Sequence, residues 1–177
     1  MCLLLFAGDE NRCDQIFVSY GPSVAGFIRA CRPIIFTDAC HRTTGHGGVL
    51  LSAIGLDADQ GLWPLAYSFA NKENNENWEW FMRRLKMQLG DHECVVMSDR
   101  NGSLITAVNL VFGEAKHSWC LRHLMKNFMD EMGRLHMKAD QKKEGKKKLY
   151  KIAYAWDERA FRMGMADLGN FKPELRV

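Results

Sequence analysis

Two aspartates follow apolar runs in this sequence of 177 residues, and their carboxylates are suited to holding a divalent metal. Asp38 closes the run "RPIIFTD", and Asp99 comes directly after "VVMS". Hard cations such as Mg²⁺ and Mn²⁺ prefer oxygen ligands, and two such metals about 4 Å apart can promote phosphodiester cleavage. The other interpretation is that each aspartate only caps a turn or a helix. Which one applies depends on whether the two strands are neighbours.

The elements that must position these acids follow from apolar periodicity. It predicts a helix over 23–31, strands over 32–38, 49–56 and 62–70, a helix over 71–90, a strand over 94–98, a helix from about 102, a short strand around 115–119 and a helix from about 121. The first three strands are close enough in sequence to form an antiparallel meander. The order predicts an α/β fold in which this meander and the later strands form a mixed sheet flanked by helices.

The chain divides into three parts by composition. We expect residues 1–134 to form the core domain and residues 135–151, which are rich in lysine, to form an exposed linker or a frayed helix. Residues 152–177 recover an amphipathic pattern and are expected to begin a helical insertion that is truncated.

The amino-acid composition says more about the environment of the protein than about its function. The hydrophobic fraction of 47% is enough for a packed core, and the net charge of +3 leaves room for a local basic patch. The six cysteines have no paired spacing and are expected to be reduced, which favours the cytosol or the nucleus. No apolar stretch approaches the length of about 20 residues that a membrane span needs, so no membrane contact is expected.

Several motifs occur in an order that resembles the plant Mutator-like element (MULE) transposase domain, of the MuDR type. They are the strand-end Asp of "RPIIFTD", the strand "LWPLAYSFA", the "EN" before "WEWF", then "SDRNGSLITAV" and "HSWCLRHLMKNF". The resemblance runs from about Phe17 to Phe128. It implies an RNase H-like fold, in agreement with the element order, and metal-dependent DNA cleavage and strand transfer by an Asp-Asp-Glu set. Asp38 matches the first acid and Asp99 the second.

The third acid of the set is not evident. Glu158 is the nearest candidate, and the alternative is that it is a solvated acid on an amphipathic helix. Ala39 and Cys40 also stand where the family tends toward Gly-Thr. We therefore expect a truncated or inactive transposase copy, with a domesticated DNA-binding or transcription-regulatory module without catalysis as the alternative function. A generic nuclease acting on RNA fits the two acids but not the other motifs.

The Cys120 and His123 pair matches the family's Cys-His motif, and His117 lies three residues before Cys120. A helix that begins with this spacing can supply two zinc ligands, but a structural zinc needs about four. The other interpretation is a buried cysteine and a hydrogen-bonded histidine that stabilise the turn.

Basic residues supply the expected contacts to DNA. Lys146, Lys147 and Lys148 belong to the lysine-rich stretch, which could contact phosphates, act as a nuclear import signal or form only a solvated face. Arg100, Arg122 and Lys126 are expected to hold the DNA backbone near the acids. The resemblance implies transposon ends and target DNA as partners, a homo-oligomer, and a nuclear location.

Overall fold

The computed structural model describes residues 2–9, 12–42 and 47–175. The chain divides into two compact units, Met1–Cys120 and Leu121–Val177, and each is described by itself below. We call them the sheet unit and the helical unit.

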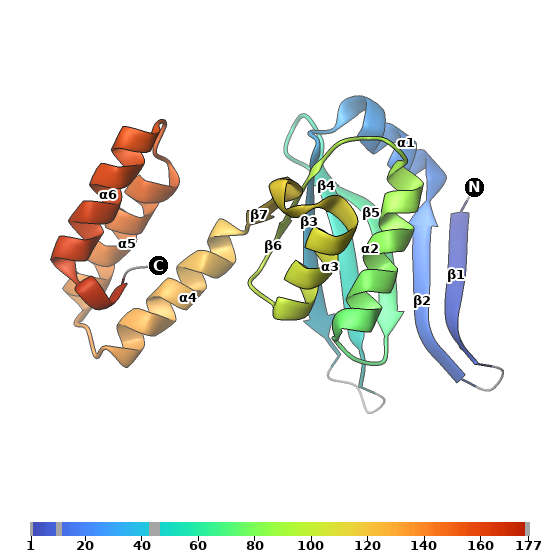
Figure 1. The fold of residues 1–177 in the computed structure, drawn as a ribbon, viewed down its shortest axis with the longest axis horizontal. Helices are drawn as coiled ribbons and strands as arrows, with labels where there is room; N and C mark the ends of the chain where they lie inside the picture. Colours follow the sequence, from blue (N-terminus) through green and yellow to red (C-terminus); the bar gives the residue numbers. More distant parts are fainter. Residues whose placement is uncertain (1, 10–11, 43–46, 176–177) are drawn as a thin grey trace. The chain divides into compact units, whose positions relative to one another are not determined.

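The sheet unit is built on a mixed sheet of seven strands, in the order β1-β2-β5-β4-β3-β6-β7 (Figure 1). The strands are β1 (Cys2–Asp9), β2 (Arg12–Tyr20), β3 (Ile34–His41), β4 (Val49–Leu56), β5 (Leu62–Ala70), β6 (Val95–Ser98) and β7 (His117–Trp119). Pairing is antiparallel from β1 to β3 along the sheet, and β6 and β7 join parallel to β3. The predicted meander and the two later strands are therefore present.

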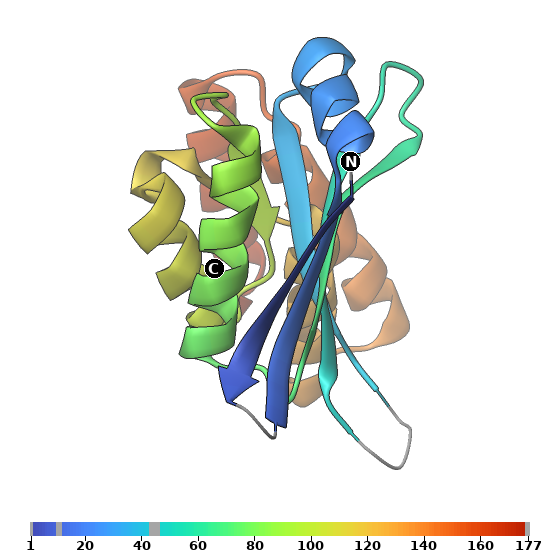
Figure 2. The same ribbon diagram turned by 90° about the vertical axis from the view of Figure 1, so that its right-hand side faces the viewer.

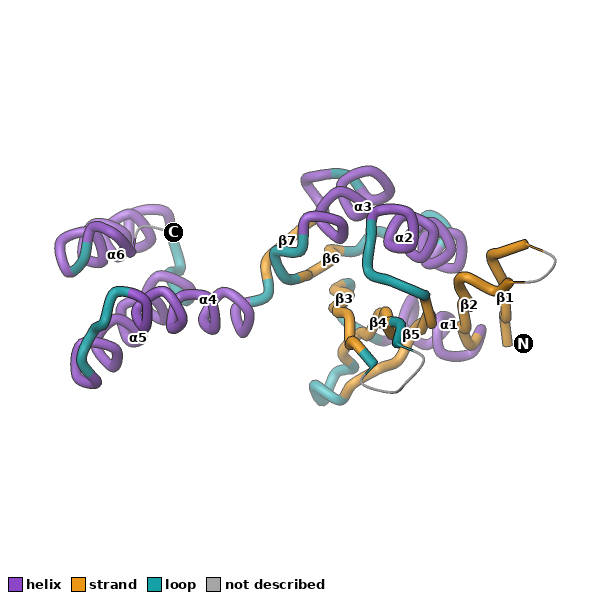
Figure 3. Tube along the Cα trace, turned by 90° about the horizontal axis from the view of Figure 1, so that it is seen from below, coloured by secondary structure: helices purple, strands orange, loops and turns teal. Residues whose placement is uncertain are grey.

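Helices α2 (Asn75–Leu89) and α3 (Gly102–Phe112) cover one face of this sheet (Figures 2 and 3). Each begins at an asparagine whose side-chain oxygen accepts backbone N–H bonds, Asn74 from Asn77 and Asn101 from Ser103 and Leu104. Their apolar sides join the buried strand residues in one core cluster. Helix α1 (Gly21–Ala30) links β2 to β3, and a short 3₁₀ helix (Glu114–Lys116) precedes β7.

The hairpin of β1 and β2 was not predicted from the sequence. Along β2 the residues facing α2 are Gln15, Phe17 and Ser19, and all three are buried. Because Gln15 and Ser19 are polar, β2 does not show the alternation of apolar and polar residues that is typical of a half-buried strand. Gln15 is accommodated because its Nε2 donates to Ser68 Oγ at 2.8 Å and to the Asn77 carbonyl oxygen at 3.1 Å.

The helical unit consists of α4 (Leu121–Arg134), α5 (Ala139–Ala153) and α6 (Glu158–Phe171), followed by a 3₁₀ turn (Pro173–Leu175). Its core is a separate cluster that includes Met125, Phe128, Met132, Leu149, Ile152 and Leu168.

The lysine-rich stretch forms a helix, whereas the sequence predicted a linker or a frayed helix over 135–151. Gly145, Leu149 and Ile152 are the buried residues of α5. They follow the i, i+4, i+7 spacing of one helix face. The stripe was missed because one of its three members is a glycine, which carries no apolar side chain.

None of the helices in the described part of the chain is long and apolar enough to cross a membrane.

Candidate metal-binding site

The register of two parallel strands bears on the positions of Asp38 and Asp99. In the β3–β6 pair, Ile34 lies opposite Val95 and Phe36 opposite Met97. Continuing this register by two residues would set Asp38 opposite Asp99, the first residue after β6. The prediction that the first strand ends at Asp38 was wrong, because β3 continues to His41. Neighbouring strands lie about 4.8 Å apart. The condition that the sequence left open, that the two strands are neighbours, is therefore met.

Strand alternation places the Asp38 carboxylate on the sheet face opposite α2 and α3. Thr37 and Ser98, the residues just before the two acids, are buried. Successive side chains of a strand alternate between faces, so Asp38 within β3 follows on the other side; Asp99 comes directly after β6, and both acids are half-buried. Thr37 Oγ1 also donates to the Met97 carbonyl oxygen at 3.5 Å, which links the two strands just below the acids.

Each aspartate carboxylate also accepts a hydrogen bond from a backbone N–H one or two residues later. Asp38 Oδ1 accepts the Ala39 N–H at 3.0 Å, and Asp99 Oδ1 accepts the Asn101 N–H at 3.0 Å. The second bond is a turn of the kind aspartate favours at strand ends. The capping interpretation is therefore correct for Asp99, and it does not compete with metal binding, because an ionised carboxylate offers about four lone-pair sites.

A buried serine and a histidine fix the backbone at Asp99. Ser98 Oγ donates to the Asp99 carbonyl oxygen at 2.8 Å and lies 2.7 Å from His117 Nε2. The serine hydroxyl has one hydrogen, so donation to the carbonyl requires that His117 Nε2 carry the hydrogen that it donates to Ser98 Oγ. Burial lowers the pKa of His117, which favours the neutral ring. The sequence did not reveal this chain of hydrogen bonds, since it depends on β7 lying beside β6.

These contacts do not bring His117 and Cys120 together as zinc ligands. Nε2 of His117 is occupied by Ser98, and the Cys120 N–H donates to the Ser98 carbonyl oxygen at 2.8 Å. In the described ranges, no group of three or more His, Cys, Asp or Glu side chains could hold a metal ion. His123 belongs to α4, in the helical unit. A zinc role for these residues stays a prediction.

Glu158 lies in the first turn of α6, in the helical unit. Its carboxylate is exposed and forms an ion pair with Arg162, one helical turn further on. These surroundings are those of a solvated helix acid, which was the alternative interpretation. Its role as the third acid stays a prediction.

The basic residues differ in how available their charges are. Arg100, Lys126, Lys146 and Lys147 have exposed side chains, as the DNA-contact hypothesis requires. Lys148 differs, because its Nζ lies 2.8 Å from Asp167 and 3.5 Å from Glu144, and its side chain is only 15% exposed.

Arg122 is also exposed, with Nη2 3.4 Å from His123 Nε2. The DNA-contact role of all six residues stays a prediction.

A family model described as "MULE transposase domain" matches residues 34–127, just over half of the chain. The chain belongs to the MULE transposase domain family. The match begins with β3 and ends in α4, so it includes both acids and the Cys120 and His123 pair. This MULE domain is also 27% identical, over 139 residues, to a transposase for insertion sequence element ISRM5 from Rhizobium meliloti (strain 1021).

The match covers 76% of the chain but only 33% of that bacterial relative. The chain thus spans about a third of the relative's length. The family match confirms the resemblance to the MULE transposase domain that the sequence motifs indicated.

Proposed function

We propose that this MULE domain supplies two carboxylates of a metal-dependent DNA transposase site. The observation that carries the proposal is the parallel pairing of β3 with β6, whose register, continued by two residues, would set Asp38 opposite Asp99. The sheet order supports the RNase H-like fold that the resemblance implied, since the meander of β3, β4 and β5 is extended from β3 by the parallel strands β6 and β7. Family membership and the transposase relative support DNA as the substrate.

The two carboxylates suit Mg²⁺ or Mn²⁺. Mg²⁺ is commonly held by one or two carboxylates and completes its shell with water and substrate phosphates, so two acids in register are a sufficient protein contribution for one ion. When bound, such ions activate water and stabilise the leaving oxygen of a phosphodiester. Asp38 and Asp99 would hold the ions, and the exposed guanidinium of Arg100 would contact a phosphate of the DNA backbone.

The finer parts of the proposal rest on the sequence resemblance. They are strand transfer after cleavage, Glu158 as the third acid, action as a homo-oligomer on transposon ends and target DNA, membership of the plant MuDR-type branch, and a nuclear location. The second candidate, a DNA-binding module without catalysis, is favoured by one observation: in the described ranges no third metal-ligating side chain joins the two aspartates.

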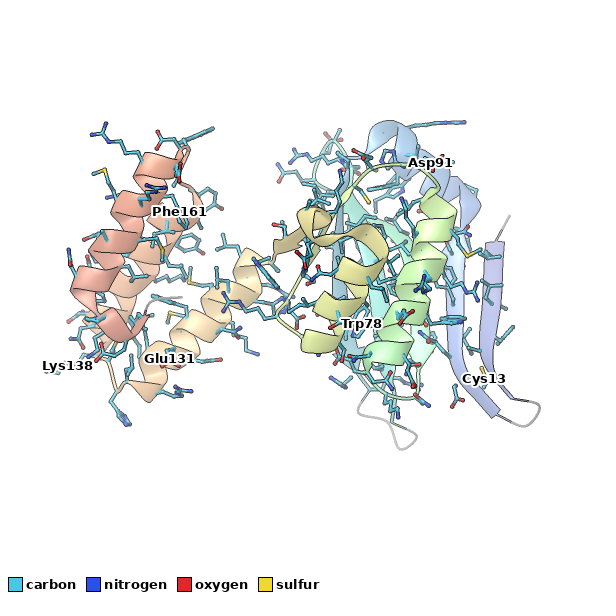
Figure 4. All side chains as sticks on the ribbon, viewed as in Figure 1. Cys13, Trp78, Asp91, Glu131, Lys138 and Phe161 are labelled. Atoms are coloured by element: carbon cyan, nitrogen blue, oxygen red, sulfur yellow. The ribbon has the colours of Figure 1, made fainter. Side chains whose placement is uncertain are left out.

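Calorimetric titration with Mn²⁺ tests the metal pair. The comparison is between the native chain, Asp38→Asn, Asp99→Asn and the double variant. A matched control is Asp91→Asn, because Asp91 is exposed and follows α2, before β6 begins, whereas Asp99 follows the end of β6 (Figure 4). We expect the control to bind like the native chain and both site variants to lose binding. Equal binding by native and double-variant chains would remove the proposal.

A nicking assay on supercoiled plasmid with Mn²⁺ separates the two candidate functions. The transposase proposal expects nicking that disappears in Asp38→Asn while DNA binding, measured by fluorescence anisotropy, is kept. The non-catalytic module expects DNA binding of the same strength in both chains and nicking in neither.

A further inference from the structure

A groove of about 380 Å³ lies on the sheet unit between α2 and α3. Helix α2 lines it with Trp80, Arg83, Arg84, Lys86 and Met87, and α3 contributes Leu110 and Val111. Helices α2 and α3 cover one face of the sheet (Figure 2), and neither aspartate is among the residues that line the groove, so the groove is separate from the proposed metal site. None of its residues has a role in the functions considered so far.

The apolar part of the groove is unusually accessible. Met87 is 65% exposed and Leu110 is 58% exposed, although each extends from a helix whose other side is in the core. Exposed apolar side chains that gather within one concave surface mark interaction sites more often than scattered ones do. Methionine is also a flexible side chain that adapts to the shape of an incoming group. The groove therefore offers an apolar surface that can adapt to the shape of a bound side chain.

Two cations at the groove have no carboxylate partner among the described residues. The guanidinium carbon of Arg84 lies 5.2 Å from the Trp80 ring centroid, and its Nη1 lies 3.5 Å from Met87 Sδ. Lys86 Nζ lies 5.8 Å from the Phe112 ring centroid. In the part of the chain that the structure describes, neither makes an ion pair, whereas Arg83 is paired with Glu79 at 2.8 Å.

Arg84 is also incompletely satisfied as a donor. Its Nε is buried and has no acceptor in the described ranges. A buried donor without an acceptor costs about 1–3 kcal/mol, and hydrogen bonds between guanidinium and carboxylate are among the strongest in proteins. A carboxylate brought by a partner would offset both the charge and the missing bond once the guanidinium turns toward it.

We propose that the α2–α3 groove binds an acidic, amphipathic segment of a partner protein. An apolar side chain of that segment would pack on Met87 and Leu110, and carboxylates beside it would pair with Arg84 and Lys86. The combination of an apolar floor and a cationic rim favours this occupant over DNA, because a phosphate backbone gains nothing from two exposed apolar side chains. The inference goes beyond the proposed function and does not depend on it.

Fluorescence anisotropy with a designed peptide tests the inference. The probe is a fluorescein-labelled amphipathic helix with leucines at i, i+4 and i+7 and glutamates beside them, and its control is a scrambled peptide of the same composition. We expect the patterned peptide to bind, and Arg84→Gln and Leu110→Glu each to weaken binding about tenfold or more. The matched control is Arg159→Gln, which removes an exposed positive charge from α6. It is expected to bind like the native chain.

The methyl resonance of Met87 locates the peptide on the protein. With methionine methyl groups labelled with ¹³C and Met87 assigned through Met87→Leu, the patterned peptide should shift the Met87 signal. The inference fails if the patterned peptide does not bind, if the scrambled peptide binds equally well, or if the Met87 signal does not move. It also fails if a short DNA duplex displaces the peptide and loses affinity in Arg84→Gln, because the cations would then serve DNA.

Discussion

The sheet unit and the helical unit are built from different kinds of core. The sheet core is held by aromatic rings in fixed contact, with the Phe17 ring centroid 5.8 Å from Phe81 and 6.3 Å from Trp80. The helical core contains three buried methionines, Met125, Met132 and Met137, packed around a few larger side chains. Aromatic side chains have few rotamers, whereas methionine fills irregular gaps. Packed aromatic rings therefore leave the side chains of the sheet core fewer alternative arrangements than methionines leave in the helical core.

The largest expected effect lies in the aromatic core. Phe17→Ala removes a ring with no exposed surface and leaves a cavity beside Trp80 and Phe81, so we expect a loss of about 3–5 kcal/mol in the free energy of unfolding. Urea denaturation followed by circular dichroism measures it. The matched control is Phe6→Ala on β1, where the ring is 62% exposed and the loss should be much smaller. Equal losses would show that the sheet core is not organised around Phe17.

A smaller loss is expected at the support of the metal site. Ser98→Ala removes the hydroxyl that His117 Nε2 contacts and leaves that nitrogen of a half-buried ring without its partner, at a cost of about 0.5–1.5 kcal/mol. Ser118→Ala on β7 is the control, since the Ser118 side chain makes no hydrogen bond within the part of the chain that the structure describes. Urea denaturation of both variants provides the comparison. If they lose the same stability, the hydrogen-bond chain to Asp99 does not stabilise the fold.

Two glycines test how closely the helical core is packed. A Cβ at Gly164 would lie 2.8 Å from Ile152 Cγ1, a stiff β-branched side chain, while a Cβ at Gly133 would meet only Lys142 Nζ at 3.9 Å. Alanine is favoured over glycine within a helix by about 1 kcal/mol, and overpacking costs about 1–3 kcal/mol. We therefore expect Gly133→Ala to raise the melting temperature and Gly164→Ala to lower it. A rise in both would show that α5 and α6 adjust freely.

The sequence predicted most of the sheet because local patterns decide strands with one apolar face. The predicted ranges 49–56 and 62–70 coincide with β4 and β5. The hairpin of β1 and β2 was missed because Gln15 and Ser19 are buried through hydrogen bonds to residues distant in sequence. Such partners cannot be deduced from a local pattern.

The candidate site was predictable for a similar reason, and only in part. Parallel strands run in the same direction, so aspartates at the ends of two predicted strands could be expected to lie close together, although β3 continues beyond Asp38 to His41. The link from His117 to Ser98 and the α2–α3 groove could not, since both depend on how separate elements pack. Trp80 and Arg84 were correctly assigned to a helix, but only the position of α3 determines that they line a groove.

The smallest expected effect concerns the ion pair that joins α5 to α6. A hydrogen bond from Lys148 holds the pKa of Asp167 below its ordinary value. A carboxyl with a lowered pKa in the folded state stabilises the fold above its unfolded pKa, about 4, and this contribution is lost as the pH falls through the folded value. Asp167→Asn should therefore lower the melting temperature slightly at pH 7, and the difference from the native chain should vanish in acid.

The same variant shows whether the pair acts through charge. Because the Asp167 carboxylate is half exposed, high salt should screen the pair and reduce the difference in melting temperature at pH 7. Glu158→Gln on α6 is the control, since its pair with Arg162 is fully on the surface and joins no two helices. A difference for Asp167→Asn that persists in acid and in salt would mean that this residue supports the helical unit by packing. The buried side chains Leu149, Ile152 and Leu168 would then hold α5 and α6 together without help from charge.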